Sequence, residues 1–343
     1  MCGDRYGRRQ NVARVHLLSA ARPGDRYWDS RAHWDLNAMR EGAASDRFGV
    51  HSLVEDPGEA NVVIFVETST CAGPYFESVR ANPTYREHRR KGYVYCATDL
   101  ILPLVPGVFP SIARENYLPA WTRAGGYIGI RETEKLRFQP ERRPSRLFSF
   151  VGSSATHGIR GEILRLSHPD AVIVNTDEAP GASATSAAPD TRYRDTLLDS
   201  AFVLCPRGGG PSTFRLMETM MMGRSPVIVS DAWCPPTGPD WDQFSVRVAE
   251  RDVRGIPDLL ESLGSRAEEM GAAARTAWLD WFAPETQFHR TVDWALELDG
   301  QAAARDGWGR LRPWWKAARP FPVLRWAKYR VRRPKPSGEA ADG

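Results

Sequence analysis

The chain has 343 residues, which is too long for one compact core and predicts two domains. Hydrophobic residues make up 42% and charged residues 26%, a balance typical of a folded globular protein and not of a disordered chain. The formal net charge of +4 is too small to indicate a nucleic-acid binder by itself.

The cysteines and the apolar segments indicate the cellular compartment in which the protein is expected. Five cysteines without a CxxC pair argue against a disulfide framework or a zinc knuckle, so a reducing compartment is expected. The N-terminus has no apolar core long enough for a signal peptide, and no window approaches the roughly 18 apolar residues of a membrane span. We expect a cytoplasmic protein with peripheral contact at the inner face of the plasma membrane.

The first half of the chain has a βαβ rhythm. Short apolar runs at 12–18, 61–66 and 92–96 predict strands, and the polar segment 75–90 predicts a helix between the last two. The continuous apolar character of 61–66 and 92–96 is typical of strands buried on both faces, as in a parallel sheet.

A basic, proline-containing stretch at 137–146 predicts a linker, and a second α/β series follows it. The predicted strands are 147–151, 171–175, 201–204 and 226–229. The predicted helices are 160–166, 193–199, 212–222, 253–270 and 273–282, and 179–189 is a small-residue loop. We therefore expect one α/β domain over 1–143, a second α/β domain over 144–300, and a basic, Trp-rich tail over 301–343.

The segment 202–218, FVLCPRGGGPSTFRLME, carries the main motif, a strand that runs through three glycines into a helix. Glycines let the backbone approach a ligand closely, and a helix N-terminus offers unpaired N–H groups that suit a diphosphate. Ser212 is a good N-cap, and Arg215 and Glu218 share a helix face, where they could take a phosphate and ribose hydroxyls. The alternative is an ordinary glycine-rich turn with a surface ion pair between Arg215 and Glu218.

The block 193–253 resembles the nucleotide-sugar half of the exostosin family of glycosyltransferases. The resembling residues are RDTLLDS (194–200), FVLCPRG (202–208), Gly209, Ser212, Arg215, Glu218, Gly223, PVI (226–228), WDQF (241–244), Val246 and Asp252. The resemblance implies a GT-B fold, in which two Rossmann-like domains with parallel sheets face a central cleft. It implies that 1–143 is the acceptor-side domain and that 144–300 is the nucleotide-sugar-binding domain. It also implies inversion at the anomeric carbon, a UDP-sugar donor, and no cofactor or divalent metal.

The same resemblance implies roles for particular residues. Glu218 would bind the ribose, and Arg160 would be a further phosphate ligand unless it is a solvent-exposed helix arginine. The residues implied to hold the diphosphate are Arg207, the backbone of Gly208, Gly209 and Gly210, Ser212 and Arg215.

An inverting transfer needs a base that deprotonates the acceptor hydroxyl. Glu67 and Asp99 each follow a predicted strand of the first domain, where reactive groups of α/β sheets collect. The alternative is that each caps the following helix or turn. His157 is a third candidate, although it also suits the donor site or an exposed loop.

Two further segments of the sequence contain aromatic residues that could contact a ligand or a surface. Trp233 and Trp241 flank a proline-rich loop and could stack on a sugar or nucleobase, or pack inward. Residues 305–335 hold eleven Lys/Arg and one acid with interleaved aromatics, which favours an anionic membrane surface over nucleic acid or a solvated tail.

We therefore expect an inverting glycosyltransferase that moves a hexosyl or glycuronosyl group from a nucleotide-diphosphate sugar to a glycan or lipid-linked glycan. It would act in the synthesis of a surface polysaccharide or glycoconjugate. The alternatives are a GT-B glycosyltransferase of another family, and a non-catalytic protein that binds a nucleotide or glycan.

Overall fold

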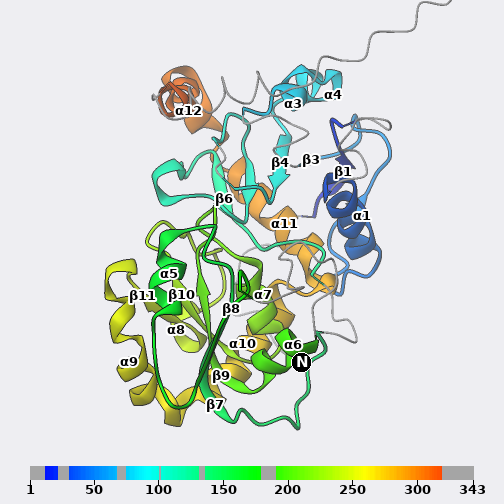
Figure 1. The fold of residues 1–343 in the computed structure, drawn as a ribbon. Helices are drawn as coiled ribbons and strands as arrows, with labels where there is room; N and C mark the ends of the chain where they lie inside the picture. Colours follow the sequence, from blue (N-terminus) through cyan, green and yellow to red (C-terminus); the bar gives the residue numbers. More distant parts are fainter. Residues whose placement is uncertain are drawn as a thin grey trace, which may run out of the picture.

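The computed structural model describes residues 12–21, 31–67, 75–99, 102–130, 136–178 and 191–318. These residues form two α/β units, each built on a parallel sheet (Figure 1). The expected α/β fold class with two Rossmann-like parallel sheets is confirmed. The predicted loop at 179–189 and the tail beyond residue 318 lie outside the described residues.

The N-terminal sheet has six strands in the order β2-β1-β3-β4-β5-β6, and every neighbouring pair is parallel. Its strands are β1 (Arg14–Leu18), β2 (Ser52–Leu53), β3 (Val62–Glu67), β4 (Gly92–Cys96), β5 (Gly107–Phe109) and β6 (Thr122–Ala124). Its helices are α1 (Arg31–Ala44), α3 (Glu77–Ala81), α4 (Pro83–Glu87) and the 3-10 turn η1 (Arg114–Asn116). The predicted strands β1, β3 and β4 are confirmed to within two residues.

Strand β3 shows why the buried strands are apolar throughout. Val62 and Ile64 pack with Met39 of α1 in one hydrophobic cluster. Val63 and Phe65 point to the other face, in a cluster with Val79 of α3 and Tyr85 of α4. Both faces are covered, so the strand has no polar alternation.

The helix predicted at 75–90 is divided into α3 and α4, and this corrects the single helix expected from the sequence. Asn82 has an extended backbone, and its Oδ1 accepts a hydrogen bond from the Thr84 amide at 2.9 Å. Pro83 then occupies the first position of α4, where a missing N–H costs nothing. The Asn-Pro pair therefore ends one helix and begins the next.

The C-terminal sheet has five parallel strands in the order β11-β10-β9-β7-β8. Its strands are β7 (Arg146–Gly152), β8 (Ala171–Asn175), β9 (Ser200–Pro206), β10 (Ser225–Val229) and β11 (Val246–Val248). Its helical elements are α5 (Gly158–Leu164), α6 (Thr191–Leu198), α7 (Phe214–Met221), α8 (Trp241–Phe244), η2 (Glu250–Gly255), α9 (Ile256–Leu263), η3 (Gly264–Arg266) and α10 (Ala267–Trp281). The long helix predicted at 253–270 is thus three elements, η2, α9 and η3, before α10 begins.

Helix α11 (Pro284–Asp299) corrects the domain boundary expected at residue 300. It packs on α1 and on strands β3, β5 and β6 of the N-terminal unit, so the chain crosses back after α10. His51, before β2, donates from Nε2 to Asp293 of α11 at 3.3 Å, and the Gln287 amide donates to the Ala38 carbonyl at 3.3 Å. The C-terminal unit therefore ends near residue 283, and α11 belongs to the N-terminal core.

The predicted tail begins with ordered structure on the N-terminal unit. It contains η4 (Ala302–Arg305), η5 (Gly307–Leu311) and α12 (Arg312–Ala317), and α12 lies beside α3 (Figure 1). Over the described ranges, no helix combines the length and the apolar character that a membrane crossing needs.

Candidate functional site

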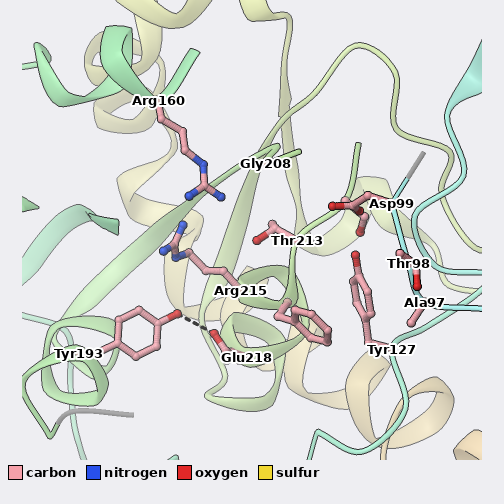
Figure 2. A pocket seen from close by; sticks show the side chains of 12 residues that line it. Ala97, Thr98, Asp99, Tyr127, Arg160, Tyr193, Gly208, Thr213, Arg215 and Glu218 are labelled. Atoms are coloured by element: carbon pink, nitrogen blue, oxygen red, sulfur yellow. Dashed lines mark hydrogen bonds between the residues drawn. The ribbon is translucent and has the colours of Figure 1, made fainter. Parts of the chain in front are cut away.

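A cavity of about 490 Å³ lies where the two units meet (Figure 2). It is bounded on one side by the end of β4 and the loop before residue 130, and on the other by α5, α6, the glycine turn and the start of α7. The lining residues are Ala97, Thr98, Asp99, Tyr127, Arg160, Tyr193, Gly208, Ser212, Thr213, Phe214, Arg215 and Glu218.

The glycine turn brings the two units into direct contact. It connects β9 to α7, and a Cβ atom added to Gly210 would lie 1.9 Å from Asp99 Oδ1 and 2.4 Å from Ser111 Oγ. Only glycine allows this approach. Gly209 and Gly210 therefore face the N-terminal unit at Asp99, whereas Gly208 lines the cavity.

Helix α7 starts at Phe214, two residues later than predicted. Its N-cap is Thr213, with an extended backbone and no side-chain capping bond, so the predicted cap at Ser212 is corrected. Ser212, Thr213 and Phe214 all line the cavity, which places the positive end of the helix dipole at its wall.

Two arginines come together on the C-terminal wall (Figure 2). Arg160 of α5 donates from Nε to the Arg207 carbonyl oxygen at 3.0 Å. Burial, with the nearby charge of Arg215, lowers the pKa of Arg160 to about 10. Arg215 stacks on Phe150 at 4.8 Å, and its buried Nε and Nη1 atoms have no hydrogen-bond partner. Two like charges at one cavity are suited to an anion between them.

Glu218 lies on the same face of α7 as Arg215, as predicted, and both line the cavity. The Tyr193 hydroxyl donates to Glu218 Oε2 at 2.6 Å. Burial raises the pKa of Glu218, although the bond from Tyr193 and the charge of Arg215 act in the opposite direction. Sequence analysis assigned no role to Tyr193, and the signal that could have found it was its place in the segment that resembles the exostosin family.

The N-terminal wall separates the two candidate bases. Asp99 lines the cavity after β4, and its Oδ1 accepts a hydrogen bond from Ser111 Oγ at 2.5 Å. Glu67 is not among the lining residues. It is fully buried at the end of β3, where it accepts hydrogen bonds from the Ala20 amide and from Ser19 Oγ at 3.1 Å. These contacts hold the segment after β1, while residues 68–74, which the capping alternative concerns, lie outside the described residues.

The buried carboxyl of Glu67 predicts a pH dependence of stability. Burial raises its pKa from the ordinary value of 4.5 to about 7, against the two hydrogen bonds. Between about pH 4.5 and 7, the folded state therefore keeps a proton on Glu67 that the unfolded state releases. The resulting contribution to the free energy of unfolding is complete below pH 4.5 and is lost as the pH rises through 7.

Unfolding by urea is expected to show a free energy roughly 2–3 kcal/mol higher at about pH 5 than at about pH 8. Glu67→Gln, which stays neutral, should flatten this slope, while Glu218 and the other groups act equally in both proteins. Equal slopes in the two proteins would contradict the assignment.

Other predicted residues lie away from the cavity wall. Arg207 Nη1 is 3.6 Å from Glu250 Oε1, and the Arg207 side chain is not among the lining groups. His157 caps α5, and its Nδ1 accepts from the Ile159 amide at 3.3 Å. Trp233 and Trp241 pack edge to face at 4.9 Å in the core, which is the inward-packing alternative.

One group among the described residues has the composition of a metal site, and it is not at the cavity. It consists of His51, His289 and Asp293 in the N-terminal unit. The Ala13 amide donates to His51 Nδ1, so the ring proton is on Nε2 and points to Asp293. This arrangement suits a hydrogen bond that joins α11 to the β2 side of the sheet better than it suits a metal site.

The two α/β units, each built on a parallel sheet, lie around a cavity that contains paired arginines. This arrangement is of the GT-B type. Comparison with known proteins adds that residues 105–263 match the family model of the Exostosin GT47 domain. Residues 105–263 are therefore similar to the glycosyltransferase domain of the exostosin GT47 family. The match contains Arg160, Arg215 and Glu218, but it begins after Asp99.

The curated relatives share only part of their length with this chain. The Exostosin-1 homolog of Caenorhabditis elegans is 39% identical over 89 residues, 25% of this chain and 23% of that protein. A probable glucuronoxylan glucuronosyltransferase of Arabidopsis thaliana is 36% identical over 75 residues, 21% of this chain and 16% of that protein. A glycosyltransferase from Rickettsia africae superposes with a TM-score of 0.40 at 10% identity, covering 83% of this chain and 97% of that one. The chain thus spans less than a quarter of the length of these curated relatives.

Proposed function

We propose that this protein is an inverting glycosyltransferase that uses a nucleotide-diphosphate sugar. One observation carries the proposal: Arg160, Arg215 and Glu218 line one wall of a cavity, and the carboxylate Asp99 lines the other. Cations on one side and a base on the other are what a single displacement at a sugar carbon requires.

The donor would lie along the C-terminal wall. Its diphosphate would sit between the guanidinium groups of Arg160 and Arg215, next to the start of α7, and the ribose hydroxyls would reach Glu218. Tyr193 would fix the Glu218 carboxylate through their hydrogen bond. Arg207 would act through its backbone, since its carbonyl oxygen orients Arg160.

Asp99 would accept the proton of the acceptor hydroxyl as that oxygen attacks the anomeric carbon. The bond from this carbon to the phosphate oxygen breaks, and the nucleoside diphosphate leaves with the electron pair. Its added negative charge would be stabilised by the two arginines, so the reaction would need no divalent metal. Attack opposite the leaving group inverts the anomeric centre. The Ser111 hydroxyl would hold Asp99 in position.

The donor and acceptor classes are also part of the proposal. A UDP-sugar with a hexosyl or glycuronosyl group is favoured by the resemblance, and the glycuronosyl choice is supported by a similar protein that is named a probable glucuronoxylan glucuronosyltransferase. The acceptor would be a glycan or lipid-linked glycan in the synthesis of a surface polysaccharide or glycoconjugate.

A thermal-shift screen tests the donor site. UDP is expected to raise the melting temperature more than GDP, ADP or TDP, by mass action worth about 2.7 kcal/mol when free ligand is about 100 times Kd. The shift should survive EDTA, and Glu218→Ala should remove most of it.

Tyr193→Phe serves as the milder control, because it keeps the Glu218 carboxylate and removes one hydrogen bond. A screen in which none of the four nucleotides shifts the melting temperature would overturn the donor site. A shift of the melting temperature without sugar transfer to any acceptor of a broad panel would instead favour a non-catalytic binding protein.

A further inference from the structure

The segment from η5 to α12 exposes an unusual number of large apolar side chains. Trp308, Leu311, Trp314 and Trp315 are 82%, 39%, 44% and 69% exposed. They make up four of the nine large hydrophobic side chains that are exposed in the described part of the chain. Such clustering marks an interaction surface, whereas single exposed apolar residues do not. We call these four residues the tryptophan platform.

The platform is fixed to the body of the protein. The guanidinium of Arg80 in α3 lies 4.7 Å from the Trp314 ring, and the Lys316 ammonium donates to the Glu115 carbonyl oxygen. Before the platform, Arg305 Nη1 donates to the Ala120 carbonyl oxygen at 3.2 Å. The indoles are therefore exposed on a docked segment. In Figure 1 this segment lies at the end of the N-terminal unit remote from the C-terminal sheet.

Basic side chains surround the platform. Arg80, Arg89 and Arg305 lie close enough to Tyr85 for their charges to act on its hydroxyl. Arg86, Arg89 and Arg90, after the start of α4, are exposed. Within the described residues 305–318, the sequence holds four basic residues and one acid. The surface around the platform is thus complementary to a negatively charged partner.

We propose that the tryptophan platform binds the surface of an anionic lipid bilayer. The indoles and Leu311 enter the headgroup region, and the arginines remain at the phosphate level. Indole rings suit this depth because they have an apolar body and one N–H donor. A leucine among the tryptophans favours lipid over single-stranded nucleic acid, whose bases stack on aromatic rings.

Cosedimentation of the full chain with lipid vesicles tests the proposal. The vesicles are pure phosphatidylcholine, or phosphatidylcholine with roughly one-third phosphatidylserine. The protein should bind the anionic vesicles and leave the neutral ones largely unbound. The double variant Trp308→Ser with Trp315→Ser should lower the partition coefficient on anionic vesicles at least about tenfold.

Matched variants test whether the same kinds of substitution at other surface positions also change vesicle binding. Trp34→Ser removes another exposed tryptophan, on α1, and should leave vesicle binding unchanged. Arg312→Gln, beside the platform, should weaken binding about fivefold on anionic vesicles only. Arg266→Gln, an exposed arginine of the C-terminal unit, should have no effect. Melting curves verify that each variant is folded.

Three results would overturn the proposal. The double tryptophan variant could bind as well as the unmodified protein, which would assign binding to the basic residues beyond 318. The protein could bind neither vesicle type. It could also bind single-stranded DNA more tightly than anionic vesicles at the same salt concentration, which would assign the surface to nucleic acid.

Discussion

Asp99→Asn is expected to lower kcat about 100- to 10,000-fold, the usual contribution of a positioned general base. The amide keeps the shape of the carboxylate and can still contact Ser111, but it cannot take a proton from the acceptor. Donor binding should stay intact, because the donor-binding side chains lie on the opposite wall. Steady-state transfer kinetics and the UDP-induced thermal shift, measured on the same preparation, test both parts.

Glu67→Gln is the matched control for Asp99→Asn. Both acids follow strands of the N-terminal sheet, but Glu67 is held by Ser19 and Ala20 and does not line the cavity. Its variant should change the pH dependence of stability and leave kcat near that of the unmodified protein. If Glu67→Gln loses turnover while Asp99→Asn keeps it, the base has been assigned to the wrong acid.

Arg215→Ala is expected to weaken binding of the nucleoside diphosphate on the order of 100-fold, since charge-assisted hydrogen bonds contribute about 2–3 kcal/mol. Arg215 lines the cavity, and its buried Nε and Nη1 have no hydrogen-bond partner. Isothermal titration calorimetry with UDP measures the change. Arg215→Lys should recover part of the affinity, because it restores the charge without the planar fork.

Arg207→Ala provides the comparison within the same motif. Its side chain faces Glu250 and only its backbone contacts Arg160, so the affinity for UDP should fall much less than in Arg215→Ala. Equal losses in the two variants would move the diphosphate to the Glu250 side of the turn. Circular dichroism of each variant separates lost binding from lost structure.

The sequence predicted the residues of the C-terminal cavity wall well, for a local reason. A buried parallel strand has a continuous apolar sequence, and a glycine turn followed by a helix is compact along the chain. Arg215 and Glu218 share a face because they are three residues apart on one helix. Gly208, Ser212 and Arg160 also reach the lining as expected.

The choice between Asp99 and Glu67 could not be made from the sequence, because both occupy the same place relative to their strands. What separates them is long-range: residues 19 and 20 cover Glu67, and the glycine turn of the other unit meets Asp99. The orientation of Trp233 and Trp241 depends on packing across the units in the same way.

Helix α11 was missed, and its buried face mixes apolar with polar side chains. Gln287, His289 and Thr291 are buried together with Phe288 and Val292. Thr291 Oγ1 donates to the Gln287 carbonyl at 2.7 Å, and His289 Nε2 lies 3.2 Å from Asp293. The buried polar positions interrupt the hydrophobic periodicity by which a helix is identified from its sequence.

The return of α11 to the first sheet has a consequence for how the protein is made. A chain that emerges from a ribosome presents β1 to β6 long before residues 284–299. Until those residues arrive, part of the sheet face that carries Val62 and Ile64 lacks the helix that covers it. The first unit to be synthesised is therefore the last to be completed, and its maturation waits for the synthesis of the second.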